Sequence, residues 1–184
     1  MLVLASQSPR RSEILRQAGI PFVVKPADVD ESARPGERPK DYVMRVAREK
    51  AQAVEAGTGD IVLGADTVVV IDGEMLGKPK DGTDAGGMLT RLAGREHQVL
   101  TGICLRREAV VHQDCAVTRV WFRPLTPDEI SSYVASGEPM DKAGAYAIQG
   151  LASKFIERID GSYTNVVGLP IELVQQALGK LETA

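Results

Sequence analysis

Hydrophobic and polar positions along the chain follow two patterns, one typical of strands and one typical of helices. Continuous apolar or β-branched runs predict strands over residues 2–5, 22–24, 61–71, 98–106, 110–122 and 153–161, with a tight turn at 72–74 leading into the apolar pair 75–76. Apolar residues that recur every three or four positions predict helices over residues 9–18, 39–57, 81–93, 127–136 and 170–181. Because helices and strands alternate and 98–106 and 110–122 are spaced as a hairpin, the pattern favours an α/β fold with a mixed sheet.

Turn and cap residues mark where some of these elements begin and end. Ser8 before Pro9 is a helix-start signature, with a hydroxyl residue at the N-cap position and a proline at the first helical position, and Gly19 ends that helix. Residues 27–39 are polar and contain two prolines, so they predict a long loop that is functional or mobile. Glycines break any regular pattern over residues 141–150.

Length and composition restrict the class of protein. A chain of 184 residues, 43% hydrophobic and 26% charged, fits one globular domain, or one domain with a lobe, that buries its own core. The formal net charge of −3 argues against a nucleic-acid or membrane-surface binder. We find no membrane-spanning run and no signal peptide, so we expect a cytoplasmic protein. Cys104 and Cys115 lie in apolar stretches without metal-ligand spacing, so we interpret them as reduced core residues; the alternative is a disulfide between them.

Arg10 and Arg11 stand where cations are unfavourable, in the first turn of a helix whose N-terminus already carries partial positive charge. Two guanidinium groups beside free backbone N–H groups form a site for a phosphate, and a bound polyanion would reverse the unfavourable dipole interaction. The alternative is a pair of solvated surface arginines. Their place directly after a strand, where α/β proteins bind ligands, favours the anion site.

Asp66 lies within the apolar run IVLGADTVVVI, where a carboxylate is costly unless it is paired, binds a metal or faces a cleft. Gly64 beside it would admit a ligand or a backbone segment. The alternative is an aspartate satisfied by nearby backbone donors. In a regular strand, Thr67 points to the opposite face.

Three further charged residues extend this candidate site. Lys50 falls seven residues after Val43, on the buried stripe of its helix, where it either answers a carboxylate or phosphate or extends its ammonium group to solvent. Lys78 lies in a rigid GKP turn, and Glu31 lies in the polar loop. Arg10, Arg11, Lys50 and Lys78 could therefore converge on a triphosphate while Glu31 and Asp66 hold Mg²⁺.

Other chemistries find no support in the motifs. The chain has no P-loop, no dinucleotide-binding glycine pattern and no nucleophile elbow. His97 and His112 lack partners three or four residues away, which argues against a zinc site or a serine triad. Trp121 is better explained by core or rim packing than by base stacking.

Eight short motifs in series resemble the Maf family of nucleotide pyrophosphatases over nearly the whole chain: LASQSPRRSEIL, DES, AREKA, GADTVVV, GKP, HQVLTG, DKAGAYAIQG and GSYTNVVGLP. The resemblance implies an elongated mixed sheet flanked by helices with a central cleft, of the inosine triphosphatase (Maf/Ham1) type. It further implies a single domain, 1–184, with two lobes around the active-site cleft, and a homodimer.

The resemblance also implies an activity and residue roles. The reaction is hydrolysis of a nucleoside triphosphate between its α- and β-phosphates with a divalent metal, Mg²⁺ or Mn²⁺. On the matching positions Asp66 is the catalytic proton acceptor and a metal ligand, and Glu31 assists with metal or water. Lys50, Lys78 and Arg11 contact phosphates, and Ser6 belongs to the same substrate-binding motif as Arg11.

Three positions resemble the branch of the family that acts on dTTP and UTP, namely Arg10, Thr67 and Gln149, whereas the branch that acts on 7-methyl-GTP has Trp, Gln and Glu. A glutamine amide offers both a donor and an acceptor, which suits the O4 and N3–H edge of uracil or thymine. We therefore expect dTTP and UTP, or modified pyrimidine nucleotides, as substrates.

Two rival functions belong to other classes. A nucleotide-sensing regulator of cell division and septum formation would bind the nucleotide without releasing pyrophosphate. A nucleic-acid binder would need a basic stripe, which the net charge disfavours. We accordingly expect a nucleoside triphosphate as the partner, with no nucleic acid and no membrane.

Overall fold

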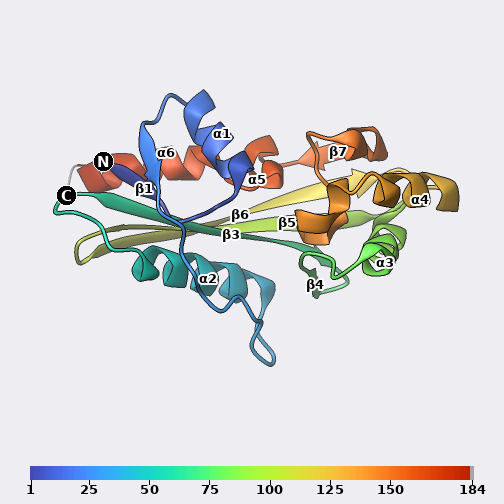
Figure 1. The fold of residues 1–184 in the computed structure, drawn as a ribbon, viewed down its shortest axis with the longest axis horizontal. Helices are drawn as coiled ribbons and strands as arrows, with labels where there is room; N and C mark the ends of the chain where they lie inside the picture. The colour runs from blue at the N-terminus through green and yellow to red at the C-terminus, as the bar shows by residue number, and fades with distance from the viewer. Residues whose placement is uncertain (183–184) are drawn as a thin grey trace. The chain divides into compact units, whose positions relative to one another are not determined.

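The computed structural model describes residues 1–182, and its elements follow the alternation of an α/β protein (Figure 1). The strands are β1 (Leu2–Leu4), β2 (Phe22–Val24), β3 (Ile61–Ile71), β4 (Glu74–Leu76), β5 (Glu96–Arg107), β6 (Val110–Phe122) and β7 (Ile156–Asp160). The α-helices are α1 (Pro9–Gln17), α2 (Pro39–Ala53), α3 (Gly82–Leu92), α4 (Pro127–Ala135), α5 (Tyr163–Val167) and α6 (Ile171–Glu182). Short 3₁₀ helices are η1 (Glu138–Asp141), η2 (Ala143–Ala145) and η3 (Leu151–Phe155).

The strands within residues 1–182 form one seven-stranded sheet in the order β2-β1-β3-β5-β6-β7, with β4 paired to β3. β1 runs parallel to both β2 and β3, whereas β4 is antiparallel to β3 and β7 is antiparallel to β6. A two-residue turn at Glu108 and Ala109 joins β5 to β6, as the hairpin spacing predicts. The expected α/β class with a mixed sheet is confirmed.

The chain divides into two compact units. Unit 1 comprises Met1–Thr67, Thr101–Ala116 and the described part of Gly168–Ala184, and unit 2 comprises Val68–Leu100 and Val117–Val167. Strands β3, β5 and β6 contribute residues to both units.

In unit 1, α2 covers one face of the sheet, and α1 and α6 lie over the other (Figure 1). Two glycines let the α2 backbone approach the strands. A Cβ atom on Gly64 would lie 2.1 Å from the carbonyl oxygen of Ala47, and one on Gly102 would lie 2.4 Å from the carbonyl oxygen of Val43. Because no side chain fits at either position, α2 lies closer to β3 and β5 than larger residues would permit.

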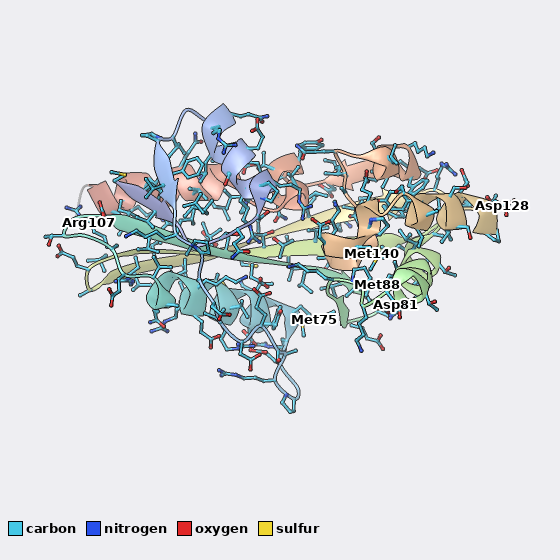
Figure 2. The ribbon with its side chains drawn as sticks, in the orientation of Figure 1. Met75, Asp81, Met88, Arg107, Asp128 and Met140 are labelled. Atoms are coloured by element: carbon cyan, nitrogen blue, oxygen red, sulfur yellow. The ribbon has the colours of Figure 1, made fainter. Side chains whose placement is uncertain are left out.

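Unit 2 is built around an aromatic cluster. Its rings pack edge to face with centroids 4.8 to 6.2 Å apart, and they belong to His97, Phe122, Tyr133, Tyr146 and Phe155. Buried residues of α3 complete this core, and Met88 of α3 and Met140 of η1, labelled in Figure 2, pack against it.

The structure corrects several predicted boundaries. α2 ends at Ala53 rather than Gly57, because Val54 adopts an extended backbone and turns into the core, where it is buried. The strand predicted over 153–161 begins only at Ile156, because η3 precedes it and places Phe155 in the aromatic cluster. The sequence pattern did not predict α5, because this short helix contains β-branched residues, which favour strands. Its start is marked by the Asn165 N–H, which donates to Ser162 Oγ.

The structure also shows the surroundings of the two cysteines and of Trp121, for which no chemical role is proposed. Cys104 and Cys115 are both free, which confirms the expected thiols, but only Cys104 is buried, so the core assignment of Cys115 is wrong. Trp121 packs at the rim, with the guanidinium groups of Arg119 and Arg158 at 5.2 and 4.6 Å from its ring centroid. Among residues 1–182, the helices are too short or too polar to cross a bilayer.

Candidate active site

A buried lysine joins two carboxylates in unit 1. Lys50 on α2 is 7% exposed, and its Nζ donates to Asp66 Oδ1 at 2.8 Å and lies 2.8 Å from Glu31 Oε1. Asp66 on β3 is 6% exposed, whereas 47% of the Glu31 side chain is exposed. The alternatives of a solvent-directed Lys50 and a backbone-satisfied Asp66 are both wrong, because each side chain is the partner of the other.

The close approach of α2 explains how Lys50 reaches Asp66. Gly64 and Asp66 are two residues apart on β3 and therefore lie on the same face of the sheet. The space at Gly64 is bounded by Ala47 and Ala51, which flank Lys50 along α2. Because Gly64 has no side chain, α2 can lie close to β3 at the point where the Asp66 carboxylate and the Lys50 ammonium group meet.

The two carboxylates suit a divalent cation. Their oxygens converge on one nitrogen atom, so Glu31 and Asp66 both face a position already occupied by positive charge. Proteins hold Mg²⁺ with one or two carboxylates together with substrate phosphates and water. Within residues 1–182 no group of three or more His, Cys, Asp or Glu side chains is arranged to hold a metal, so phosphates and water would have to complete the coordination.

The loop that carries Glu31 is attached to α2 at the backbone carbonyl groups of Glu31 and of the residue that follows it. Tyr42 donates its hydroxyl to the carbonyl oxygen of Glu31 at 2.9 Å, and Arg45 donates to the carbonyl oxygen of Ser32 at 3.0 Å. Arg45 also pairs with Glu37 at 2.6 Å, and this hydrogen bonding lowers the pKa of Glu37 to about 2. The predicted loop over 27–39 therefore lies against α2 through specific side-chain contacts.

Arg11 forms a second charged centre in unit 1. It is 8% exposed and donates from Nε to the Gly168 carbonyl at 2.8 Å, from Nη1 to Ser6 Oγ at 3.0 Å and from Nη2 to Thr67 Oγ1 at 3.1 Å. Thr67 Oγ1 in turn lies 2.9 Å from Thr101 Oγ1. Burial lowers the pKa of Arg11, and all three acceptors are neutral, so its charge has no ion-pair partner within residues 1–182. Such a cation attracts an anion.

The first turn of α1 differs from the sequence-based expectation. Ser8 occupies the N-cap position without a side-chain cap, so the predicted capping is wrong; its N–H donates instead to Ser6 Oγ at 3.2 Å. The Arg11 side chain reaches β3 at Thr67, whereas Arg10 is half-buried and its side chain makes no hydrogen bond or ion pair with any residue in 1–182. Arg10 is therefore the arginine of the pair left open to a ligand.

Two candidate residues belong to unit 2. Lys78 is exposed just after β4, and Gln149 is exposed in a turn between η2 and η3. The Gly144 N–H donates to the carbonyl oxygen of Gly77 at 3.0 Å, so the GKP turn is bonded to the segment that leads to Gln149. Neither side chain hydrogen-bonds to any part of the chain that the structure describes.

Two side-chain contacts, one in each unit, could not be predicted from the sequence. Tyr42 lies on α2, and its hydroxyl holds the Glu31 loop. His97 lies in the aromatic cluster of unit 2, where its Nε2 lies 2.8 Å from Tyr146 Oη and burial lowers its pKa to about 4. Partners 11 and 49 residues apart leave no spacing signal, so only the folded chain brings them together.

Two solved structures share this fold at low identity. The structure of the Staphylococcus aureus Ham1 protein matches 97% of this chain and 98% of its own, with a TM-score of 0.54 and 14% identity. A HAM1 protein from Coxiella burnetii covers the same shares with a TM-score of 0.52 and 17% identity. These likenesses confirm the expected Maf/Ham1-type fold.

Sequence relatives are much nearer, and their names agree. A protein of Anaeromyxobacter sp. (strain Fw109-5) named dTTP/UTP pyrophosphatase is 56% identical, over 96% of this chain and 89% of the relative. One of the same name from Symbiobacterium thermophilum (strain DSM 24528 / JCM 14929 / IAM 14863 / T) is 55% identical, over 96% of this chain and 92% of the relative. The family model described as Maf-like protein matches residues 1–181. The chain therefore belongs to the Maf-like protein family.

Proposed function

We propose that this protein is a nucleoside triphosphate pyrophosphatase that hydrolyses dTTP and UTP to the nucleoside monophosphate and pyrophosphate, and so removes nucleotides from the cellular pool. The shared name of the relatives supports this activity. One structural observation supports it most directly: a buried lysine that places the Asp66 and Glu31 carboxylates at one point. The rival reading as a cell-division regulator is not favoured, since the relatives are named as enzymes.

In the proposed reaction, water attacks the α-phosphorus and the bond to the α,β-bridging oxygen breaks. Asp66 Oδ1 accepts from Lys50, while Oδ2 hydrogen-bonds to none of the residues in 1–182 and is the oxygen that we assign to the attacking water. Asp66 accepts the proton of the attacking water, and pyrophosphate leaves with the bridging oxygen. Base assistance of this kind contributes roughly 10²–10⁴-fold.

The cationic side chains stabilise charge on the leaving group, which is the larger contribution in phosphoryl transfer. We assign Arg11, Lys50 and Lys78 to the phosphates, with Ser6 orienting the Arg11 guanidinium through its 3.0 Å hydrogen bond. A divalent metal, Mg²⁺ or Mn²⁺, held by Glu31 and Asp66, would neutralise phosphate charge when bound.

The remaining assignments concern the nucleoside and the assembly. Arg10, Thr67 and Gln149 are proposed to contact the nucleoside, with the Gln149 amide matching the donor and acceptor of uracil or thymine. A two-lobed Maf-type domain over 1–184, a homodimer and a cytoplasmic location, without nucleic-acid or membrane partners, are further parts of the proposal. Light scattering coupled to size-exclusion chromatography measures the oligomeric state directly.

A panel of nucleoside triphosphates incubated with Mg²⁺ or Mn²⁺ tests the activity. We expect pyrophosphate and monophosphate from UTP and dTTP, at higher kcat/KM than from CTP, ATP or GTP. In ¹⁸O-labelled water the label should enter the monophosphate, since the attack is on the α-phosphorus. Release of orthophosphate and a diphosphate, or binding without hydrolysis, would refute the proposal.

A further inference from the structure

Gln149 lies in a short turn of unit 2 that has its own internal support. The Gly150 N–H donates to the Ala147 carbonyl at 3.2 Å, and the Ser153 N–H donates to the Gly150 carbonyl at 3.0 Å as η3 begins. Gln149 is exposed between these bonds. The position of its amide therefore depends on how the two ends of residues 147–151 are held.

One tyrosine and one glutamate hold both ends. Tyr133 Oη accepts from the Ala147 N–H at 3.3 Å and donates to Glu138 Oε1 at 2.7 Å. Glu138 Oε2 accepts from the Leu151 N–H at 3.1 Å. A single chain of hydrogen bonds thus runs from one end of the turn to the other through two side chains that lie outside it.

This support is fixed by packing as well as by hydrogen bonds. Tyr133 is 3% exposed, and its ring packs edge to face against Phe155 with centroids 5.3 Å apart. A Cβ on Gly150 would lie 2.3 Å from Glu138 Oε1, so the carboxylate fills the space beside the turn that any other residue there would need. Burial raises the pKa of Tyr133, which keeps its hydroxyl as the donor. η1, the helix of Glu138 and Met140, packs on the unit 2 core (Figure 2).

We propose that Tyr133 and Glu138 are positioning residues that set the base preference of the enzyme by fixing the Gln149 turn. The inference rests on the proposed function, because it presumes that Gln149 reads the base. An amide selects a base edge only if its donor and acceptor are held at fixed positions, since a turn that samples several positions loses affinity for the matched base. Neither Tyr133 nor Glu138 needs to touch the nucleotide.

Two conservative variants test this role. Tyr133→Phe keeps the buried ring and removes the hydroxyl, and Glu138→Gln keeps the shape and removes the charge. In each we expect the ratio of kcat/KM for UTP to that for CTP to fall by about tenfold, the factor that corresponds to one lost hydrogen bond. The loss should come from UTP rather than from both substrates equally.

Glu129→Gln on α4 is the matched control. Glu129 pairs with Arg123 at 2.6 Å and forms the capping box in the first turn of α4 with Thr126. This variant also exchanges a carboxylate for an amide and weakens the start of the helix that carries Tyr133, but it removes no hydrogen bond to residues 147–151. Its UTP to CTP ratio should equal that of the wild type. A folded Tyr133→Phe or Glu138→Gln variant with the wild-type ratio would overturn the inference.

Amide hydrogen exchange gives a readout that needs no turnover. The Ala147 and Leu151 amides should exchange at least about tenfold faster in Tyr133→Phe than in the wild type, because their acceptors are removed or released. Unchanged exchange rates would show that Tyr133 and Glu138 do not hold residues 147–151, whatever the activity of the variant, and would overturn the inference. A wild-type protein that hydrolyses no pyrimidine triphosphate refutes the proposed function, whereas an active variant with unaltered preference and exchange refutes this inference alone.

Discussion

Replacement of Lys50 by methionine would test how the candidate site is held in the folded chain. Lys50→Met keeps the length and apolar stem of the side chain and removes the ammonium group between Asp66 and Glu31. The Lys50 and Asp66 side chains are 9% and 8% exposed, so the variant leaves a buried carboxylate without its cation. Breaking a buried ion pair on one side costs about 3–5 kcal/mol.

The two acids should contribute unequally to that cost. Glu31 retains 47% of its side-chain exposure and can return to water, so the loss of its pair with Lys50 costs only about 0–1 kcal/mol. Asp66 therefore accounts for most of the effect. The double variant Lys50→Met with Asp66→Asn should recover a large part of the loss, because a neutral amide replaces the unpaired charge.

Urea unfolding measures both quantities. Circular dichroism reports helices of both units, whereas Trp121 fluorescence reports unit 2, so coincident transitions would justify a single unfolding free energy. Arg16→Met provides the control, since Arg16 and Glu13 form a pair with side chains 63% and 51% exposed and should cost less than about 1 kcal/mol. A loss for Lys50→Met no larger than that of the control, or no recovery in the double variant, would refute the reasoning.

Asp66→Asn should lower kcat by roughly 10²–10⁴-fold with nucleotide binding still measurable by calorimetry, and a near-normal kcat would remove Asp66 from the role of proton acceptor. Tyr42→Phe removes one of the contacts that hold the Glu31 loop to α2, so kcat should fall by about tenfold with only a small decrease in Tm, and an unaltered kcat would show that the loop needs no such hydrogen bond. Gln149→Glu should shift kcat/KM away from UTP and dTTP, and unchanged ratios would count against base reading by the amide. Burial lowers the pKa of His97 from 6.5 to about 4, so as the pH falls the unfolded chain binds this proton before the folded chain does, and the free energy of unfolding decreases between pH 6.5 and 4. His97→Gln should reduce the slope of the unfolding free energy against pH in this range, and equal slopes in the variant and the wild type would contradict the prediction.

Local pattern was sufficient to predict which residues were unusual. Lys50 on a buried helical stripe and Asp66 in an apolar strand both violate the rule that charges avoid the interior, and the structure pairs these two with each other. The alternation of elements predicted the α/β class for the same reason: hydrophobic periodicity reflects which face of each element is covered.

The local sequence pattern could not predict contacts between segments that are distant in the sequence. Tyr42 and Glu31 meet through a loop, and Tyr133 reaches Ala147 across two 3₁₀ helices, so neither pair has a helical or strand spacing. The first turn of α1 shows a different limit. Its serine and proline mark the start of the helix, but the hydroxyl that the Ser8 N–H and Arg11 both use belongs to Ser6.

The backbone contact at Gly64 has a consequence for how variation in this chain should be interpreted. With the Ala47 carbonyl 2.1 Å from where a methyl group would begin, even alanine there would displace α2 from β3 and separate Lys50 from Asp66. An inactive natural or engineered variant can therefore carry every reactive group intact and differ only by one added carbon on a residue that meets no substrate. For redesign, positions 64 and 102 determine how closely the helix lies to the sheet. That spacing in turn sets the distance between the charges of the reactive centre.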